Sequence, residues 1–326
     1  MDKMKLFLLI AALLAFSVMQ GCIIPDLTES GNVPKEPVQA APVPQQAAAA
    51  NATVPATPQA QMPDIAFIST GMGESTLLLS DSGAVLVDAG QDPDAAAVIS
   101  VLAKYQVKKI SMLVITRPTA PHYAGAATIA KGFSVPWVVT NGATGNDAYK
   151  EMIVGFTKKR IIVEDAYLGW SQTVAGWEVR ALNPQRVPGE IVTDAAKDSM
   201  VLQVRKGGLC AILMSDAEGS GSSSPDAGTV FGGAESKIAA MPGIEGCQIL
   251  RVGAYGSGNA ASLQLLNMMK PKYGIVSVGI NSDGLPQEAA LERMRIANMT
   301  VFRTDKQGTI LAYAKNGSIE VKPMAG

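Results

Sequence analysis

The chain contains a single histidine, His122, within the stretch TRPTAPHYAG at residues 116–125. An imidazole can bind a metal ion or transfer a proton near neutral pH, but most isolated histidines are ordinary hydrogen-bonded residues. The preceding run, ISMLVIT (110–116), is typical of a buried strand, and AGAATIA (124–130) begins a helical pattern. We therefore expect His122 in a strand-to-helix loop, at the sheet edge where α/β proteins gather their ligands.

The elements that would position this loop follow a regular alternation of short strands and helices. In the first half, strands are predicted at 64–70, 75–81, 84–90, 110–116, 137–142 and 160–165, with helices at 93–105 and 146–159. The second half predicts a hairpin at 199–216 that turns at Gly207-Gly208, strands at 247–253, 273–279, 300–305, 309–314 and 318–323, and helices at 260–270 and 286–298. Two sheets with helices outside both would satisfy this pattern and give a four-layer αββα sandwich in the α/β class.

Six segments then carry a family resemblance. In order, they are STGMGEST, AVLVDAG, TRPTAPHYAG, LMSDAEG, RVGAYGSGN and VGINSDGLPQEAALERM. Their order and spacing resemble the metallo-β-lactamase fold, and most of all the hydrolase domain attached to bacterial competence DNA-uptake channels. The resemblance covers residues 64–322 and implies an αββα sandwich whose site lies at the shared edge of the two sheets.

The resemblance also implies where metal ligands would stand. Family members bind Zn²⁺ or Mn²⁺ through a histidine-and-aspartate motif after the fourth strand, a later aspartate and later histidines, so that bound water becomes nucleophilic. This chain departs from that pattern at most positions. The replacements are Arg117 for the leading histidine, Pro121 for the aspartate of the Asp-His pair, Ala254 and Tyr255 for a later histidine pair, and Leu285 for the final histidine.

Three acidic or imidazole positions keep their type: Asp88, His122 and Asp216. Such a reduced set does not make a catalytic metal site, so His122 is interpreted as the remnant of a metal motif. Arg117 is expected to supply the missing positive charge by pairing with Asp216 or Asp88, and to grip an anion when one is bound. The alternative is an arginine at a strand end that points into solvent. The predicted vestigial site comprises Asp88, Arg117, His122, Asp216 and Tyr255.

These residues predict a protein that acts by binding an anionic ligand or a partner protein, without metal-dependent hydrolysis and without a cofactor. Two alternatives remain open. One is a hydrolase of phosphodiester or similar bonds that uses zinc or manganese at Asp88, His122 and Asp216. The other is an accessory subunit of a DNA-uptake or envelope assembly.

The amino terminus predicts export and membrane attachment. Lys3 and Lys5 precede an apolar run that ends in Gly21-Cys22, which resembles a lipoprotein signal with Cys22 as the lipidated residue. An uncleaved membrane helix is the alternative. Residues 23–62 are rich in proline, alanine and glutamine, which is typical of a disordered linker. The predicted organisation is therefore a signal at 1–22, a linker at 23–62 and a folded domain at 63–326, tethered to the outer face of the cytoplasmic membrane or in the cell envelope.

Charge and cysteine content limit the remaining choices. The net charge is −1, and the basic clusters 108–109, 158–160 and 270–272 are interpreted as solvated ends of elements, so nucleic acid is not the expected partner. Cys210 and Cys247 are each expected in a strand, and the family resemblance implies that these two strands lie side by side and parallel. An exported protein can form a disulfide, but buried free thiols are favoured because such strands seldom offer disulfide geometry.

Overall fold

The computed structural model describes residues 61–93, 95–192, 194, 196–220 and 232–325. The predicted signal, the lipidation site Cys22 and nearly all of the linker lie outside the described residues. Within the described part, no helix is long and apolar enough to cross a membrane.

The first sheet has the strand order β15-β14-β1-β2-β3-β4-β5-β6. Its strands are Ile65–Phe67 (β1), Thr76–Ser80 (β2), Gly83–Val87 (β3), Ile110–Ile115 (β4), Trp137–Thr140 (β5), Ile162–Asp165 (β6), Ile310–Lys315 (β14) and Ser318–Pro323 (β15). The strands β3 to β6 run parallel to one another. Their carboxyl ends therefore meet at one edge of the sheet and their amino ends at the other.

The second sheet has the order β13-β12-β11-β10-β9-β8-β7. Its strands are Ser171–Val174 (β7), Trp177–Asn183 (β8), Val201–Lys206 (β9), Leu209–Leu213 (β10), Ile249–Arg251 (β11), Tyr273–Val276 (β12) and Thr300–Arg303 (β13). The strands β10 to β13 run parallel. Lys206 at the end of β9 and Trp177 at the start of β8 both donate to the Leu79 carbonyl of the first sheet. These residues lie beside the amino ends of β10 and β3. The parallel strands of the two sheets therefore have their carboxyl ends on the same side.

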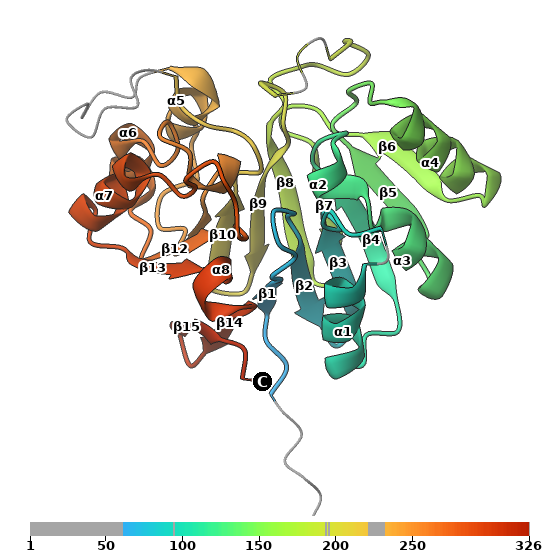
Figure 1. The fold of residues 1–326 in the computed structure, drawn as a ribbon, viewed down its shortest axis with the longest axis horizontal. Helices are drawn as coiled ribbons and strands as arrows, with labels where there is room; N and C mark the ends of the chain where they lie inside the picture. The colour runs from blue at the N-terminus through green and yellow to red at the C-terminus, as the bar shows by residue number, and fades with distance from the viewer. Residues whose placement is uncertain (1–60, 94, 193, 195, 221–231, 326) are drawn as a thin grey trace, which may run out of the picture. The chain divides into compact units, whose positions relative to one another are not determined.

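Helices cover the outer face of each sheet (Figure 1). On the first sheet lie Ala96–Lys104 (α1), Ala120–Tyr123 (α2), Ala126–Gly132 (α3) and Asp147–Lys158 (α4), and with the second sheet lie Gly233–Ala239 (α5), Leu263–Met269 (α6) and Glu288–Ile296 (α7). Shorter helical turns are Ala254–Gly256 (η1) and Thr304–Gln307 (α8). One apolar core fills the space between the sheets. A second lies between the first sheet and its helices, and a third between the second sheet and its helices. This is the expected αββα sandwich.

Most predicted helices and strands are confirmed. Two elements differ from the prediction: the helix that holds His122 and the hairpin of β7 and β8. His122 lies in the short helix α2 and not in a loop, because Thr119 is extended and Pro121 fits the first turn of a helix. The sequence missed this helix because the apolar helical pattern begins only at Ala124. The hairpin of β7 and β8 was also missed, since β7 (SQTV) is polar and mostly exposed.

The prediction that both cysteines are free thiols was wrong, because Cys210 and Cys247 form a disulfide. Cys210 is in β10, but Cys247 precedes the first residue of β11, so it does not lie in the parallel ladder. It sits in a turn after Gly246, whose φ of 72° bends the chain toward β10. The Cα atoms lie 4.6 Å apart, within the usual disulfide range. Strand geometry therefore did not apply to this pair.

Candidate functional site

The predicted site residues meet where the carboxyl ends of strands from both sheets converge. Asp88 follows β3, Arg117 comes two residues after β4, and Asp216 lies in the loop after β10. Asp88 adopts a left-handed conformation with φ 61°, which turns its carboxylate toward the end of β4. The Thr116 backbone N–H donates to Asp88 Oδ1 at 2.8 Å. A strained backbone at such a place is typical of functional sites.

His122 is fully buried and bridges the two sheets. Its Nδ1 lies 3.3 Å from Asp88 Oδ2, and its Nε2 lies 3.3 Å from Asp216 Oδ2. Burial alone would lower the pKa of His122, but the Asp88 charge and the hydrogen bonds that His122 donates to both carboxylates raise it to about 10. Both ring nitrogens therefore carry hydrogens at neutral pH, and His122 is an imidazolium held between two acids.

Arg117 pairs with Asp216 through Nη1, as the sequence expectation required. Burial would raise the pKa of Asp216, but His122 and Arg117 together lower it to about 2. The Arg117 side chain is 25% exposed and that of Asp216 is 10% exposed. Arg117 Nε and Asp216 Oδ1 are buried without a hydrogen-bond partner among the described residues. The pair thus lies at the solvent boundary of the cluster with unused hydrogen-bonding capacity.

A second arginine, which the sequence interpretation missed, lies at the centre of the site. Arg251, at the end of β11, is fully buried, and its Nη2 lies 2.6 Å from Glu74 Oε2 and 3.8 Å from Asp88 Oδ2. Its Nη1 donates to Thr76 Oγ1 at 3.1 Å. Burial raises the pKa of Glu74 to about 7 despite the nearby guanidinium. The available signal was an arginine inside the apolar strand pattern CQILRVG, because charged residues are almost never fully buried unless paired.

Hydroxyl groups connect the acids across the two sheets. Thr116 Oγ1 donates to Asp88 and lies 2.6 Å from Ser215 Oγ. Ser199 Oγ lies 2.9 Å from Ser215 Oγ and accepts from the Asp216 backbone N–H at 3.1 Å. These contacts satisfy buried polar groups that would otherwise cost stability. Sequence patterns gave no signal for them, since serine and threonine at strand ends are common.

Tyr255 lies in the turn η1, beside the same cluster. Ala254, Tyr255 and Gly256 have consecutive positive φ values of 46°, 56° and 76°. Burial, followed by the charges of Glu74, Asp216 and Asp88, raises the pKa of the Tyr255 phenol above its usual range. The phenol therefore stays neutral and can only donate or accept hydrogen bonds there.

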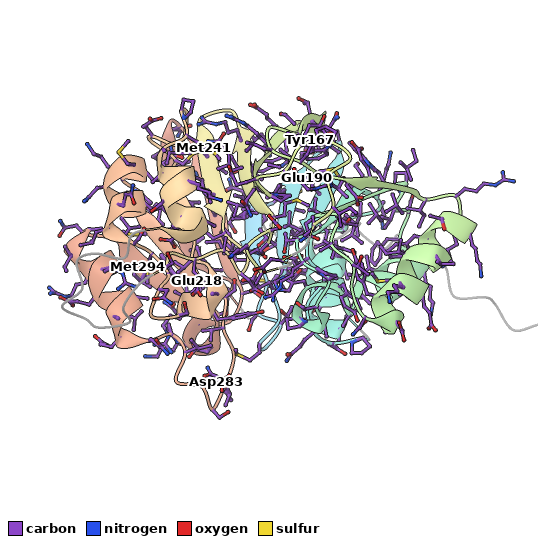
Figure 2. All side chains as sticks on the ribbon, turned by 90° about the horizontal axis from the view of Figure 1, so that it is seen from above. Tyr167, Glu190, Glu218, Met241, Asp283 and Met294 are labelled. Atoms are coloured by element: carbon purple, nitrogen blue, oxygen red, sulfur yellow. A yellow bond between two sulfur atoms is a disulfide. The ribbon has the colours of Figure 1, made fainter. Side chains whose placement is uncertain are left out.

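The loops flanking Tyr255 hold it in place. Ser257 donates to the Glu218 carboxylate, and a Cβ on Gly256 would meet Pro286 at 2.6 Å. Pro286 ends a loop whose tip, near Asp283, projects from the body of the fold (Figure 2). Leu285, at the family's final histidine position, thus lies on a loop that packs beside the site.

The acids and cations of the cluster are paired with one another. Glu74, Asp88 and His122 offer ligand atoms within 4.8 Å of one another. However, Arg251 already pairs with Glu74, Thr116 donates to both Asp88 oxygens, and both His122 nitrogens face carboxylates. His122 would have to lose a proton before it could bind a metal ion. Three cations, Arg117, His122 and Arg251, face three acids, Glu74, Asp88 and Asp216.

Comparison with known proteins gives one curated relative. No family model matches the chain. The ComE operon protein 3 of Bacillus subtilis (strain 168) is 23% identical over 284 residues, which cover 80% of this chain and 34% of that protein. The chain therefore spans about a third of that relative's length.

Solved structures give weaker, fold-level likenesses. The metallo-β-lactamase fold protein YhfI from Bacillus subtilis has a TM-score of 0.46 at 12% identity, covering 80% of this chain and 100% of that one. Zn²⁺-bound PqqB from Methylobacterium extorquens has a TM-score of 0.45 at 12% identity, covering 75% and 99%. The two sheets with outer helices have the architecture that the sequence motifs implied. The chain folds as an αββα sandwich. In this chain, arginine and imidazolium groups occupy the shared sheet edge where the resemblance implies metal ligands.

Proposed function

We propose that this metallo-β-lactamase-fold protein binds a ligand without metal-dependent hydrolysis. The observation that carries the proposal is the state of His122, whose two ring nitrogens each face a carboxylate at 3.3 Å. With Arg117 and Arg251 paired to the acids around it, the cluster already holds as many cationic as acidic side chains, and adding a dication would place further positive charge in a buried space. The proposed site needs no cofactor.

The ligand proposed for this site is a small anion held by Arg117. Its guanidinium is partly exposed and offers a planar fork that suits a carboxylate or phosphate. Asp216 holds the guanidinium when no ligand is bound, so an anion must compete with that carboxylate. Weak, salt-sensitive binding is therefore expected. A partner protein presenting an acidic side chain would use the same contact.

Two other functions stay as candidates. A metal-dependent phosphodiesterase is supported by the spacing of Glu74, Asp88 and His122, whose ligand atoms lie within 4.8 Å. An accessory role in a DNA-uptake or envelope assembly is supported by the similarity to ComE operon protein 3. For all three functions, we propose that the chain is exported and tethered to the membrane, either through lipid on Cys22 or through an amino-terminal helix.

Elemental analysis separates binding from hydrolysis. We expect no zinc or manganese to remain after dialysis of the purified chain, and no release of product from a chromogenic phosphodiester with either ion added. About one equivalent of metal that disappears in His122→Ala, together with metal-dependent turnover, would support the hydrolase instead.

Anion binding is tested with inorganic phosphate and calorimetry. Arg117→Ala should abolish the heat of binding, whereas the control Arg295→Ala should keep it, because Arg295 is 74% exposed and pairs only with Glu292 on α7. Equal binding by both variants would place the anion elsewhere.

A further inference from the structure

Seven exposed basic side chains lie along one rim of the first sheet, where β4, β5 and β6 begin. We call this group the basic rim. Its members are Lys104, Lys108, Lys109, Lys131, Lys158, Lys159 and Arg160. They come from the ends of α1, α3 and α4 and from the turns that follow these helices. The rim lies at the end of the fold opposite the site, because the site is at the carboxyl ends of the same strands.

Strand pairing brings these residues together. Lys109 forms a parallel bridge with Ser134, and the Ile110 N–H donates to the Ser134 carbonyl at 3.0 Å. The Ile162 N–H donates to the Pro136 carbonyl at 3.1 Å. The basic clusters 108–109 and 158–160, which look like separate solvated ends in the sequence, therefore belong to neighbouring strand starts of one sheet. They are exposed ends of elements, as the sequence predicted, and strand pairing places them along the same rim.

Helix capping explains only part of this charge. Lys104, Lys131 and Lys158 lie in the last turns of α1, α3 and α4, where a cation interacts favourably with the helix end. The other four members lie beyond those helices. Among the ion pairs formed by the described residues, none includes a member of the rim. Repulsion among these unpaired positive charges raises the free energy of the folded protein, and an external anion would relieve it.

The rim also carries an apolar group and the start of the folded chain. Ile162, the first residue of β6, is 64% exposed. A cavity of about 290 Å³ beside β4 is lined by Lys108 and Lys109 together with Met62, Tyr105 and one acid, Asp81. The described chain therefore enters the fold next to the rim. It does so at the lower edge of the view in Figure 1, where α1 also ends.

We propose that the basic rim docks onto the surface of an anionic phospholipid bilayer. Lysine-rich surfaces are attracted to anionic headgroups, and an exposed isoleucine among them can enter the headgroup region. The predicted membrane attachment precedes Met62 in the sequence, and Met62 lines the cavity beside the rim. Docking in this orientation turns Arg117 and the site away from the lipid. Each basic residue that reaches the surface strengthens binding about fivefold, and salt weakens it.

The test uses the full-length chain with two kinds of vesicle, one of phosphatidylcholine alone and one with phosphatidylglycerol added. Amine acylation is timed at individual lysines by mass spectrometry. We expect acylation of Lys108, Lys109, Lys158 and Lys159 to slow about threefold or more on the anionic vesicles, and to recover in 1 M NaCl. Lys197, which is 85% exposed and lies toward the site, should react equally with both. Because the tether is the same in both samples, the difference isolates the rim.

Charge-removing variants complete the test. Lys108→Gln/Lys109→Gln should restore fast acylation of Lys158 and Lys159 on anionic vesicles, whereas the control Lys197→Gln/Lys237→Gln should not. Thermal unfolding checks that each variant is folded. Equal acylation on the two vesicle types would overturn the proposal. So would protection that appears only when duplex DNA is added to phosphatidylcholine vesicles, because the rim would then recognise nucleic acid.

Discussion

Replacing Arg251 with methionine tests whether buried charge pairing holds the site together. Arg251 and its partner Glu74 are both fully buried, with Nη2 and Oε2 2.6 Å apart, so solvent cannot screen the carboxylate once the guanidinium is gone. Removing one partner of such a pair costs about 3–5 kcal/mol. For a domain of this size, that corresponds to a melting temperature lower by about 6–20 °C. Methionine keeps most of the side-chain volume, so packing loss adds little.

The deficit in Arg251→Met should depend on pH. Burial already raises the pKa of Glu74 from 4.5 to about 7, and losing Arg251 removes the strongest influence that lowers it. When the pKa of a carboxyl group is higher in the folded protein than in the unfolded chain, the protein loses stability as the pH rises above the unfolded-state pKa. The reason is that the unfolded chain then ionises more readily than the folded protein. The difference from the original chain should therefore be small near pH 5 and largest near pH 8.

The assay is guanidinium unfolding of the purified chain, followed by circular dichroism at both pH values. The double variant Arg251→Met/Glu74→Met removes both charges and should recover most of the lost free energy of unfolding. If the single variant stays within about 1 kcal/mol of the original chain at pH 8, the pair contributes no more than an exposed one. If the double variant is no more stable than the single, the loss does not come from an unpaired Glu74. Either result refutes the argument.

Three further outcomes follow from the structure and the sequence. Cys210→Ser/Cys247→Ser should lower the free energy of unfolding by about 4 kcal/mol, since the disulfide closes a separation of 37 residues, and unchanged denaturant midpoints with and without reductant would contradict the bond. The pKa of His122 is raised from 6.5 to about 10, so this residue stabilises the fold fully below pH 6.5 and loses that effect as pH rises toward 10. The free energy of unfolding should therefore fall over this pH range in the original chain, and much less in His122→Gln. Cys22→Ser should leave an unprocessed precursor or release the protein from the detergent phase, and unchanged partitioning would favour an uncleaved membrane helix.

Much of the site could be located from the sequence. Asp88, Arg117 and Asp216 were assigned from the family resemblance, and the structure brings all three to the same sheet edge as His122. The pairing of Arg117 with an acid was also expected from charge balance. The motif spacing carried no information about Arg251 and Glu74, which are separated by 177 positions and meet only because β11 faces the start of β2.

The sequence by itself determined the order of strands and helices, because apolar periodicity and turn residues act over short distances along the chain. It also determined the loss of ligand types at 117, 121, 254, 255 and 285. Tertiary structure decided the Arg251 pair, the disulfide and the joining of 108–109 with 158–160 into one rim. Each depends on which strands become neighbours and in what register. That is a property of long-range pairing, and residues that lie far apart in the chain carry no local pattern for it.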